Sequence, residues 1–534
     1  MATPHVAGRV ALLMASQPEA PLSDIIQVLK ETALHRSRTK GSPRYPHPKC
    51  ELPNALKPTD KGTTTMRCAI VFLLSLPALV FPCPGVANQP DSAPVAVGTA
   101  VVDVTPSYPI RLMGYGSRKT ESEGVASPLK VRAIAIGEGT DDNPDTGPAV
   151  LITVDNCGVG AFMTNEVARR LGAKAGIRRE RLVTCATHTH CAPALARGLD
   201  FIFGVSVPAD QKARIERYTK ELIDAMEQAA LRALAARAPG RLCWGQGSVG
   251  FAANRRVLKK GKWVGFGVNP NGPTDPNLPV LRVTDPEGKV RAVLMNYACH
   301  CTTLGGEFNQ VCAEWAGYAC DDIERQYPGA TALMIIGCGA DANPELRRNL
   351  DDAKSHAAAL AREAYRLLST SLAPLPGRIT ARFQQIDLPM APRPDRQTLV
   401  KQAKLTGAEG MFACALIEGL DRGESLPSSI PYPVQTWCFG DDLALVFLGG
   451  EVVVDYALRL KWEINANRVW VTACSNDVPC YIASKRVLSE GGYETDQSMV
   501  FYGRPARLAT EAEDLIVRTV HQLLPPAFDG PRKP

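Results

Sequence analysis

Short apolar runs alternate with amphipathic segments along the chain from about residue 88 onward. The runs hold five to eight residues, which is typical of buried strands. Apolar residues such as Ile215, Tyr218 and Leu222 recur at the helical steps of three and four. The alternation predicts one large α/β unit over residues 88–534 with no linker inside it. The expected strands are 131–136, 150–154, 182–186, 290–297, 331–336, 443–448 and 469–473, the expected helices are 209–237, 351–369, 396–406, 452–466 and 505–523, and the expected loops are 139–148, 267–279 and 424–433.

Residues 66–87 have the pattern of a secretory signal peptide. The segment starts with Met-Arg, continues with an almost wholly apolar run at 69–81, and ends with small residues from Gly85. The apolar run of 13 residues is shorter than the roughly 20 that a membrane span needs. Prolines within and after the run argue against a buried helix. Cys83 offers the alternative of a lipid anchor, but the Phe-Pro before it lacks the small residues of such a site.

Residues 1–14 contain the run Met-Ala-Thr-Pro-His-Val-Ala-Gly. This run resembles the segment that follows the nucleophilic serine of subtilisin-like proteases, although the serine itself is absent. Nucleophile, base and orienting carboxylate are needed together for that chemistry, so we expect no proteolysis. We interpret residues 1–65 as the remnant of the C-terminal end of such a protease. The secreted protein is then expected to start at Met66.

Composition and charge narrow the function classes. The chain has 534 residues, 45% hydrophobic and 21% charged, which excludes disorder over most of its length. The net charge is +6, and residues 1–65 carry nine Lys and Arg against five Asp and Glu. The remainder is therefore close to neutral, and nucleic-acid binding is not expected. Thirteen of the sixteen cysteines follow residue 87, and most are expected to be small buried residues, with room for one or two disulfides.

Four short segments after residue 180 concentrate chemically active side chains. His188 and His190 lie just past one expected strand, and His300 lies just past another. Glu451 follows a strand and two glycines, and Tyr481 lies in a Pro-Cys-Tyr-Ile segment. Each feature alone has a plain structural alternative, since such a histidine or tyrosine is often a buried core residue. Glu451 alone is equally compatible with a carboxylate at a helix start.

Taken in order, these segments resemble the neutral/alkaline non-lysosomal ceramidases over about residues 95–500. The family carries a Thr-His-Thr-His-Ser-Gly-Pro motif, and here Cys191 and Ala192 replace the Ser-Gly. Its Pro-Gly-Glu-Phe motif is matched by Gly450 and Glu451. The further matches are Asp103, 112–116, Asn254–Arg255, 296–303 (loosely), 317–319 and 481–483.

The resemblance implies mixed β-sheets flanked by helices and one catalytic zinc ion. The implied metal ligands are His188, His300, Glu451 and Tyr481, a set of N and O donors that suits zinc. The other implied roles are proton transfer or substrate orientation for His190, oxyanion stabilisation for Arg255, a contribution of Asn343 to catalysis, and substrate binding for Gly114, Tyr115 and Asp341. Asp155, at a strand end, is a further candidate.

One position departs from the family pattern. Where the family has Gly-Asp-x-Ser-Pro-Asn, residues 339–345 place Asn343 at the position of the serine. An asparagine cannot act as an alkoxide nucleophile, whereas a zinc–water mechanism survives the change. The sequence ends near the point where the family's C-terminal immunoglobulin-like domain would begin, so we expect this domain to be missing.

The sequence therefore predicts a zinc-dependent hydrolase that cleaves the amide bond of N-acylsphingosine (ceramide) or a related N-acyl substrate with a metal-activated water. The alternatives are a hydrolase of another amide or ester in the same site, and a non-catalytic secreted protein that retains the fold. The lipid substrate is expected at a membrane surface, with no transmembrane span. The expected location is secreted or periplasmic, through the segment at 66–87.

Overall fold

The structure is a computed structural model that describes residues 93–139 and 146–528. All of these residues belong to one unit, 86–534. The interpretations of residues 1–65 and 66–87 lie outside the described residues. In the described part, no helix is both long enough and apolar enough to cross a membrane.

Nine strands form a large mixed sheet. Eight follow one path in the order β11-β10-β9-β5-β1-β2-β3-β4, and β13 pairs with β5. The pairs β3–β4 and β10–β11 are parallel and the other neighbours antiparallel. The sheet curls, because β11 also contacts β1 to β4. Its strands are β1 (Val95–Asp103), β2 (Lys130–Ile136), β3 (Ala149–Val154), β4 (Leu182–Ala186), β5 (Ala238–Ser248), β9 (Asn277–Thr284), β10 (Val290–Tyr297), β11 (Thr331–Ile336) and β13 (Ala373–Leu375).

A four-stranded sheet in the order β14-β15-β16-β18 packs against the large sheet. The two sheets share one apolar core, in which Trp244 of the large sheet lies 6.2 Å from Trp470 of the small one, between ring centroids. Burial of both faces accounts for the continuous apolar runs in the sequence. The strands are β14 (Ile379–Pro389), β15 (Ser429–Phe439), β16 (Leu443–Leu448) and β18 (Val469–Thr472).

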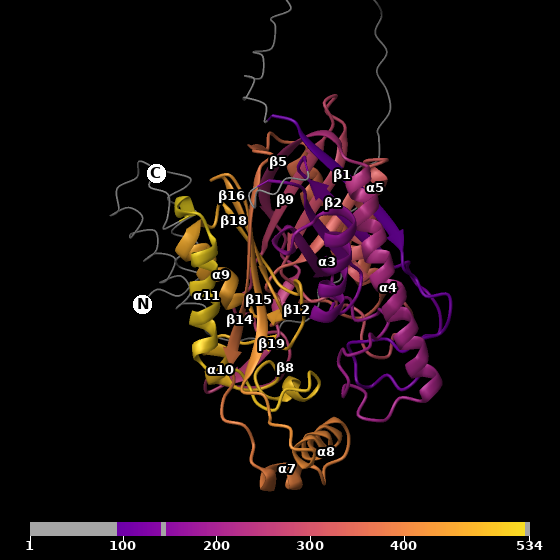
Figure 1. Cartoon of the computed structure of the whole chain (residues 1–534), viewed down its shortest axis with the longest axis vertical. Coiled ribbons are helices and arrows are strands. Elements are labelled where there is room, and N and C mark those ends of the chain that lie inside the picture. The colour runs from indigo at the N-terminus through magenta and orange to yellow at the C-terminus, as the bar shows by residue number, and fades with distance from the viewer. Residues whose placement is uncertain (1–92, 140–145, 529–534) are drawn as a thin grey trace, which may run out of the picture. The chain divides into compact units, whose positions relative to one another are not determined.

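Helices cover the outer faces of both sheets, which gives four layers (Figure 1). Helices α3 (Ala161–Ala175) and α4 (Ala209–Ala235) cover β1 to β4. Helices α5 (Glu314–Gln326) and α6 (Leu350–Leu368) cover the β5–β9–β11 region, and α9 (Val454–Leu460) and α11 (Glu511–Leu523) cover the small sheet. The short elements are β6 (Ala252–Asn254), β7 (Arg256–Lys259), β8 (Lys262–Phe266), β12 (Ala342–Pro344), β17 (Glu451–Val452), β19 (Tyr481–Ile482), α10 (Lys485–Glu490) and the turns η1 (Arg179–Arg181), η2 (Lys461–Asn465), η3 (Gln497–Val500) and η4 (Pro526–Phe528).

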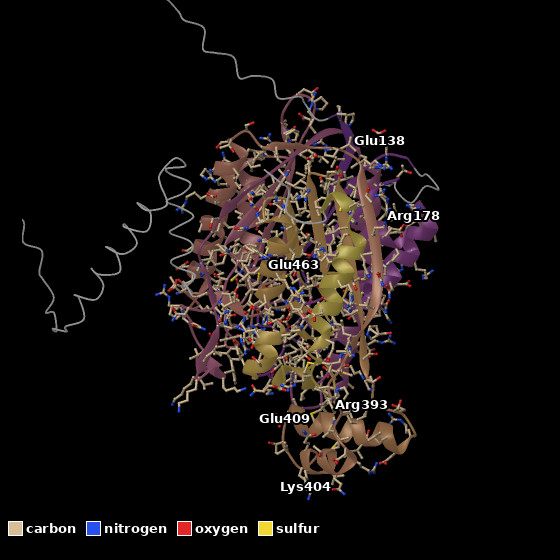
Figure 2. All side chains as sticks on the ribbon, turned by 90° about the vertical axis from the view of Figure 1, so that its left-hand side faces the viewer. Glu138, Arg178, Arg393, Lys404, Glu409 and Glu463 are labelled. Carbon is tan, nitrogen blue, oxygen red and sulfur yellow. The ribbon has the colours of Figure 1, made fainter. Side chains whose placement is uncertain are left out.

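A helical hairpin interrupts the small sheet between β14 and β15. It consists of α7 (Arg396–Gln402) and α8 (Ala408–Asp421). Figure 2 labels Lys404 and Glu409 on this hairpin, which projects beyond the ends of the strands.

The predicted α/β class with mixed sheets is confirmed, and all seven expected strands are present with shifts of at most one residue. The expected loop at 424–433 is wrong, because Ser429–Phe439 is β15. Pro431 and Pro433 argued against a strand there. They fit because β15 pairs with β16 only from Val434 onward, so before that point one edge of the strand needs no N–H donor. The helix expected from residue 505 begins only at Glu511.

The thirteen cysteines of the described residues are all free thiols, and all but Cys243 and Cys414 are buried. The described part therefore contains none of the disulfides for which the sequence left room.

Candidate metal centre

Four segments far apart in sequence meet where parallel strands end. His188 follows β4, and His300 follows β10. Isolated main-chain pairing of Thr189 with Cys301 brings these two segments together. Glu451 begins β17 and pairs in register with Tyr481 of β19. The strand ends thus gather the side chains that the sequence singled out.

His188 and His300 are each held by the ring nitrogen that faces away from the centre. The Nδ1 of His188 lies 2.6 Å from the carbonyl oxygen of Cys157. The Nδ1 of His300 lies 2.9 Å from the carbonyl oxygen of Gly339. A carbonyl only accepts, so each Nδ1 carries a proton, and each Nε2 faces the centre.

The two Nε2 atoms converge on one carboxylate. Each lies 3.1 Å from Oε2 of Glu451. Burial alone would raise the pKa of Glu451, but the histidines outweigh it and hold the pKa well below its usual range. Burial and the charge of Arg255 lower the pKa of His300 to about 4. The centre therefore combines an ionised Glu451 with a neutral His300. For His188, the charge of Glu451 outweighs burial and raises the pKa well above its usual value.

The residues present fit a metal ion. The ligand atoms of His188, His300 and Glu451 lie within 4.8 Å of one another, and all three residues are buried. Their 3.1 Å separations are close to the ~3.3 Å edge of a tetrahedron with bonds of about 2.0 Å. A cavity of about 10 Å³, lined by all three, leaves room for little more than one ion. Anchoring of the outer nitrogens is the usual support of metal-binding histidines.

Tyr481 and Arg255 border this centre. The Tyr481 hydroxyl lies 3.4 Å from Nε2 of His300 and accepts a hydrogen bond from Arg255 at 3.1 Å. Arg255 is buried, and its Nε donates to Glu494 at 2.9 Å. The ion pair with Glu494 fixes the guanidinium, so that its Nη1 lies 3.3 Å from Nε2 of His300. A fixed cation thus lies beside the candidate ligand atoms.

Asn343 lies on the same side as Arg255. Its Oδ1 accepts hydrogen bonds from Thr302 at 3.1 Å and from Arg255 at 3.4 Å. Since both partners are donors, they define the amide orientation and leave the Nδ2 group of Asn343 to donate elsewhere. The residue at the family's serine position is thus a hydrogen-bond donor.

His190 is brought to the centre as well, with its Nε2 3.3 Å from Nε2 of His188. Its Nδ1 is buried and has no hydrogen-bond partner among the described residues. Gly114 packs under the ring: its φ is +97°, and a Cβ there would lie 2.5 Å from the imidazole. Tyr115 contacts the ring edge at 5.1 Å between centroids. Gly114 and Tyr115 therefore set the position of His190.

Two candidate acids have other partners. Asp341 is fully buried, and its carboxylate accepts from the backbone N–H of Val454 at 2.9 Å and from Asn254 at 3.1 Å. These contacts tie helix α9 to the strand that precedes Arg255. Asp155 forms a buried ion pair with Arg132 at 3.0 Å. Both carboxylates thus hold the scaffold together in this structure.

Sequence reasoning missed two contributors. Tyr502 donates a hydrogen bond to Oε1 of Glu451, and Cys157 supplies the carbonyl that holds His188. A backbone acceptor has no residue signature, and Tyr502 lies outside every motif.

The neutral ceramidase of Pseudomonas aeruginosa is 23% identical over 356 residues, a match covering 62% of this chain and 49% of that protein. The chain thus spans about half the length of this curated relative.

Two solved structures share the fold. The crystal structure of neutral ceramidase from Pseudomonas aeruginosa matches with a TM-score of 0.61 and 17% identity, over 80% of this chain and 74% of that one. A structure described as ceramidase complexed with C2 matches with a TM-score of 0.62 and 16% identity, over 81% and 76%. Residues 95–363, half of the chain, match the family described as neutral/alkaline non-lysosomal ceramidase, N-terminal. The chain belongs to the neutral/alkaline non-lysosomal ceramidase family.

Proposed function

We propose that this chain is a zinc-dependent amidohydrolase that cleaves N-acylsphingosine or a related N-acyl amide by attack of water. The observation that carries the proposal is the convergence of two backbone-anchored histidines on the ionised, buried Glu451. His188, His300 and Glu451 would hold the zinc ion, with the Tyr481 hydroxyl as the fourth donor. Zinc bound there would supply a Lewis acid able to polarise an acyl carbonyl and to lower the pKa of a water molecule.

The chain's own residues would bind and orient the amide. Arg255 offers guanidinium N–H groups beside the ligand atoms, and the Nδ2 of Asn343 offers a second donor. Donors fixed before reaction stabilise the negative charge that develops on a carbonyl oxygen. His190, with an unpartnered Nδ1, is placed to hold or transfer a proton.

Asn343 decides between two mechanisms. It has no hydroxyl to form an acyl–enzyme, so water has to be the nucleophile if the chain is active. Two donors occupy its Oδ1, which prevents that oxygen from binding an N–H of the substrate.

The proposal also includes export to the outside of the cell or the periplasm, which depends on residues 66–87.

The test is zinc content and fatty-acid release with the full chain. Purified protein is measured as prepared, after chelation and after zinc addition, against C2- to C16-ceramides and simple N-acyl amides. We expect zinc-dependent release, and loss of both zinc and turnover in His188→Ala and Glu451→Ala. His521→Ala is the matched control, because that histidine pairs with Glu463 away from the centre. Zinc retained at the wild-type level in both ligand variants would refute the assignment. Zinc bound without turnover of any acyl substrate would favour the non-catalytic alternative.

A further inference from the structure

A separate cavity of about 110 Å³ adjoins the metal centre. Two of its lining residues contact metal-ligand candidates directly. Cys157 accepts from Nδ1 of His188, and Tyr502 donates to Glu451. The cavity therefore lies one residue away from the metal centre, on the side of His188 Nδ1 and Glu451 Oε1.

Two arginines line this cavity. Nε of Arg504 donates to the carbonyl oxygen of Pro479 at 3.0 Å, and its two terminal nitrogens have no hydrogen-bond partner among the described residues. Arg197 has its guanidinium carbon 5.4 Å from the ring centroid of Phe162. No carboxylate of the described residues forms an ion pair with either arginine. Each arginine lies near one carboxylate without forming an ion pair with it: Asp200 for Arg197 and Asp477 for Arg504. Both therefore offer guanidinium N–H groups to this cavity.

Asp477 is the one acidic residue of the lining. Its Oδ1 accepts from the backbone N–H of Ala161 and of Val478, both at 2.8 Å. The carboxylate is thus engaged in holding the start of helix α3. The charged lining sums to two cations and one anion, so the cavity favours an anionic group.

The volume sets a second limit. Pockets that enclose whole drug-sized ligands measure about 300–1,000 Å³, so about 110 Å³ suits a carboxylate or a group of similar size and not a lipid chain. A second cavity of about 220 Å³ shares no lining residue with it and is lined by Asn343 and by the half-exposed Phe266 and Val268. The apolar residues there suit an alkyl chain.

We propose that the substrate of this chain carries an anionic group close to the scissile amide, bound by Arg197 and Arg504. The substrate class is an N-acyl amino acid, or a monoamide of a dicarboxylic acid, which share a carboxylate a few atoms from the amide. This inference rests on the proposed amidohydrolase function and narrows it, because ceramide is neutral.

The test uses zinc-loaded full chain and matched acid–amide pairs. N-dodecanoylglycine and N-dodecanoylglycinamide place the group on the amine side, whereas N-dodecylsuccinamic acid and N-dodecylsuccinamide place it on the acyl side. The readout is the ratio of kcat/KM for the acid to that for its neutral amide. We expect kcat/KM for the acid to exceed that for its neutral amide by about tenfold or more in one of the two pairs. The pair that shows this preference identifies whether the anionic group lies on the amine side or on the acyl side of the scissile amide.

Variants then assign the preference to the cavity. Arg504→Gln is expected to reduce the ratio about tenfold, Arg197→Gln less because that residue is exposed, and Arg504→Lys to restore part of it. Arg507→Gln, three residues further and paired with Asp496, is the matched control and should leave the ratio unchanged. A general loss of folding or activity cancels in the ratio.

Failure of this inference differs from failure of the proposed function. Suppose that neutral amides are hydrolysed in a zinc-dependent way and that kcat/KM is nearly the same for each acid and its amide. This result would refute the anionic subsite and would still support the proposed amidohydrolase function. If no compound is hydrolysed, the affinities of N-dodecanoylglycine and N-dodecanoylglycinamide are compared by calorimetry. Tighter binding of the acid that is lost in Arg504→Gln would support the anionic subsite, and equal affinities of the two compounds would refute it.

Discussion

Replacement of Tyr502 by phenylalanine tests the metal centre at a residue that no motif indicates. Tyr502 donates its hydroxyl hydrogen to Oε1 of Glu451, while the other oxygen, Oε2, faces the two histidines. Burial, together with the nearby Glu451, raises the pKa of Tyr502 well above its usual value, so the phenol remains a donor at neutral pH. Tyr502→Phe removes this donor and leaves the ring in place.

The magnitude follows from burial of the acceptor. Glu451 is only 5% exposed, so water cannot readily replace the lost hydrogen bond. An unsatisfied buried acceptor costs about 1–3 kcal/mol, and more when it is charged. At about 1.4 kcal/mol per factor of ten, zinc affinity should fall about 10- to 100-fold, which is the usual effect of losing such a supporting contact.

The assay is competition for zinc with a chelator of known affinity, at fixed pH. Tyr456→Phe is the matched control, because Tyr456 is fully buried and donates to the carbonyl oxygen of Ala483 instead of to a ligand. It should destabilise the fold without changing the zinc affinity. An affinity of Tyr502→Phe within about twofold of wild type would refute the assignment of Glu451 as a ligand held by Tyr502.

Three other substitutions probe the surrounding residues. Gly114→Ala should lower turnover while zinc stays bound, because a Cβ at this position would contact His190. The φ of +97° should also make the substitution cost about 1–3 kcal/mol of stability. Activity and melting temperature are compared with those of Gly124→Ala, where a Cβ would meet open space. Asn343→Ser should lower kcat/KM about tenfold by removing the Nδ2 donor, and a rise above wild type would indicate a seryl mechanism. Burial raises the pKa of Asp341 from 3.8 to about 6, so the folded state binds an extra proton between these pH values. Wild type should therefore lose up to about 3 kcal/mol relative to Asp341→Asn between pH 4 and pH 7 in denaturant unfolding, and a constant difference would contradict the raised pKa.

The sequence predicted the elements that are buried on both faces. Residues 131–136, 150–154 and 331–336 read as apolar runs because helices cover one face of the large sheet and the small sheet covers the other. Strands with partly polar faces were not predicted from the apolar runs. The strand at 379–389 alternates buried and exposed positions, and its partner at 429–439 contains two prolines.

The sequence predicted those parts of the candidate site whose residue types indicate metal binding. It did not predict the supporting contacts between residues that are far apart in the chain. The histidines and Glu451 each follow a strand, and strand ends gather in space. Tyr502 is 51 residues from Glu451, and Arg255 is 239 residues from Glu494. Neither pair lies on one element, so no periodicity connects its members. These partners become visible only with the fold.

The main-chain anchors explain how the motifs can drift while the centre persists. His188 and His300 are oriented by the carbonyl oxygens of Cys157 and Gly339, and every residue type offers a carbonyl. Cys191 and Ala192 can therefore replace the Ser-Gly of the family motif without moving the ring nitrogens. This is consistent with a shared fold at 17% identity to a solved ceramidase. The same reasoning singles out Asn343, where the side chain itself faces the reacting groups: a change there alters the chemistry, so the mechanism and substrate of this chain have to be measured at that position.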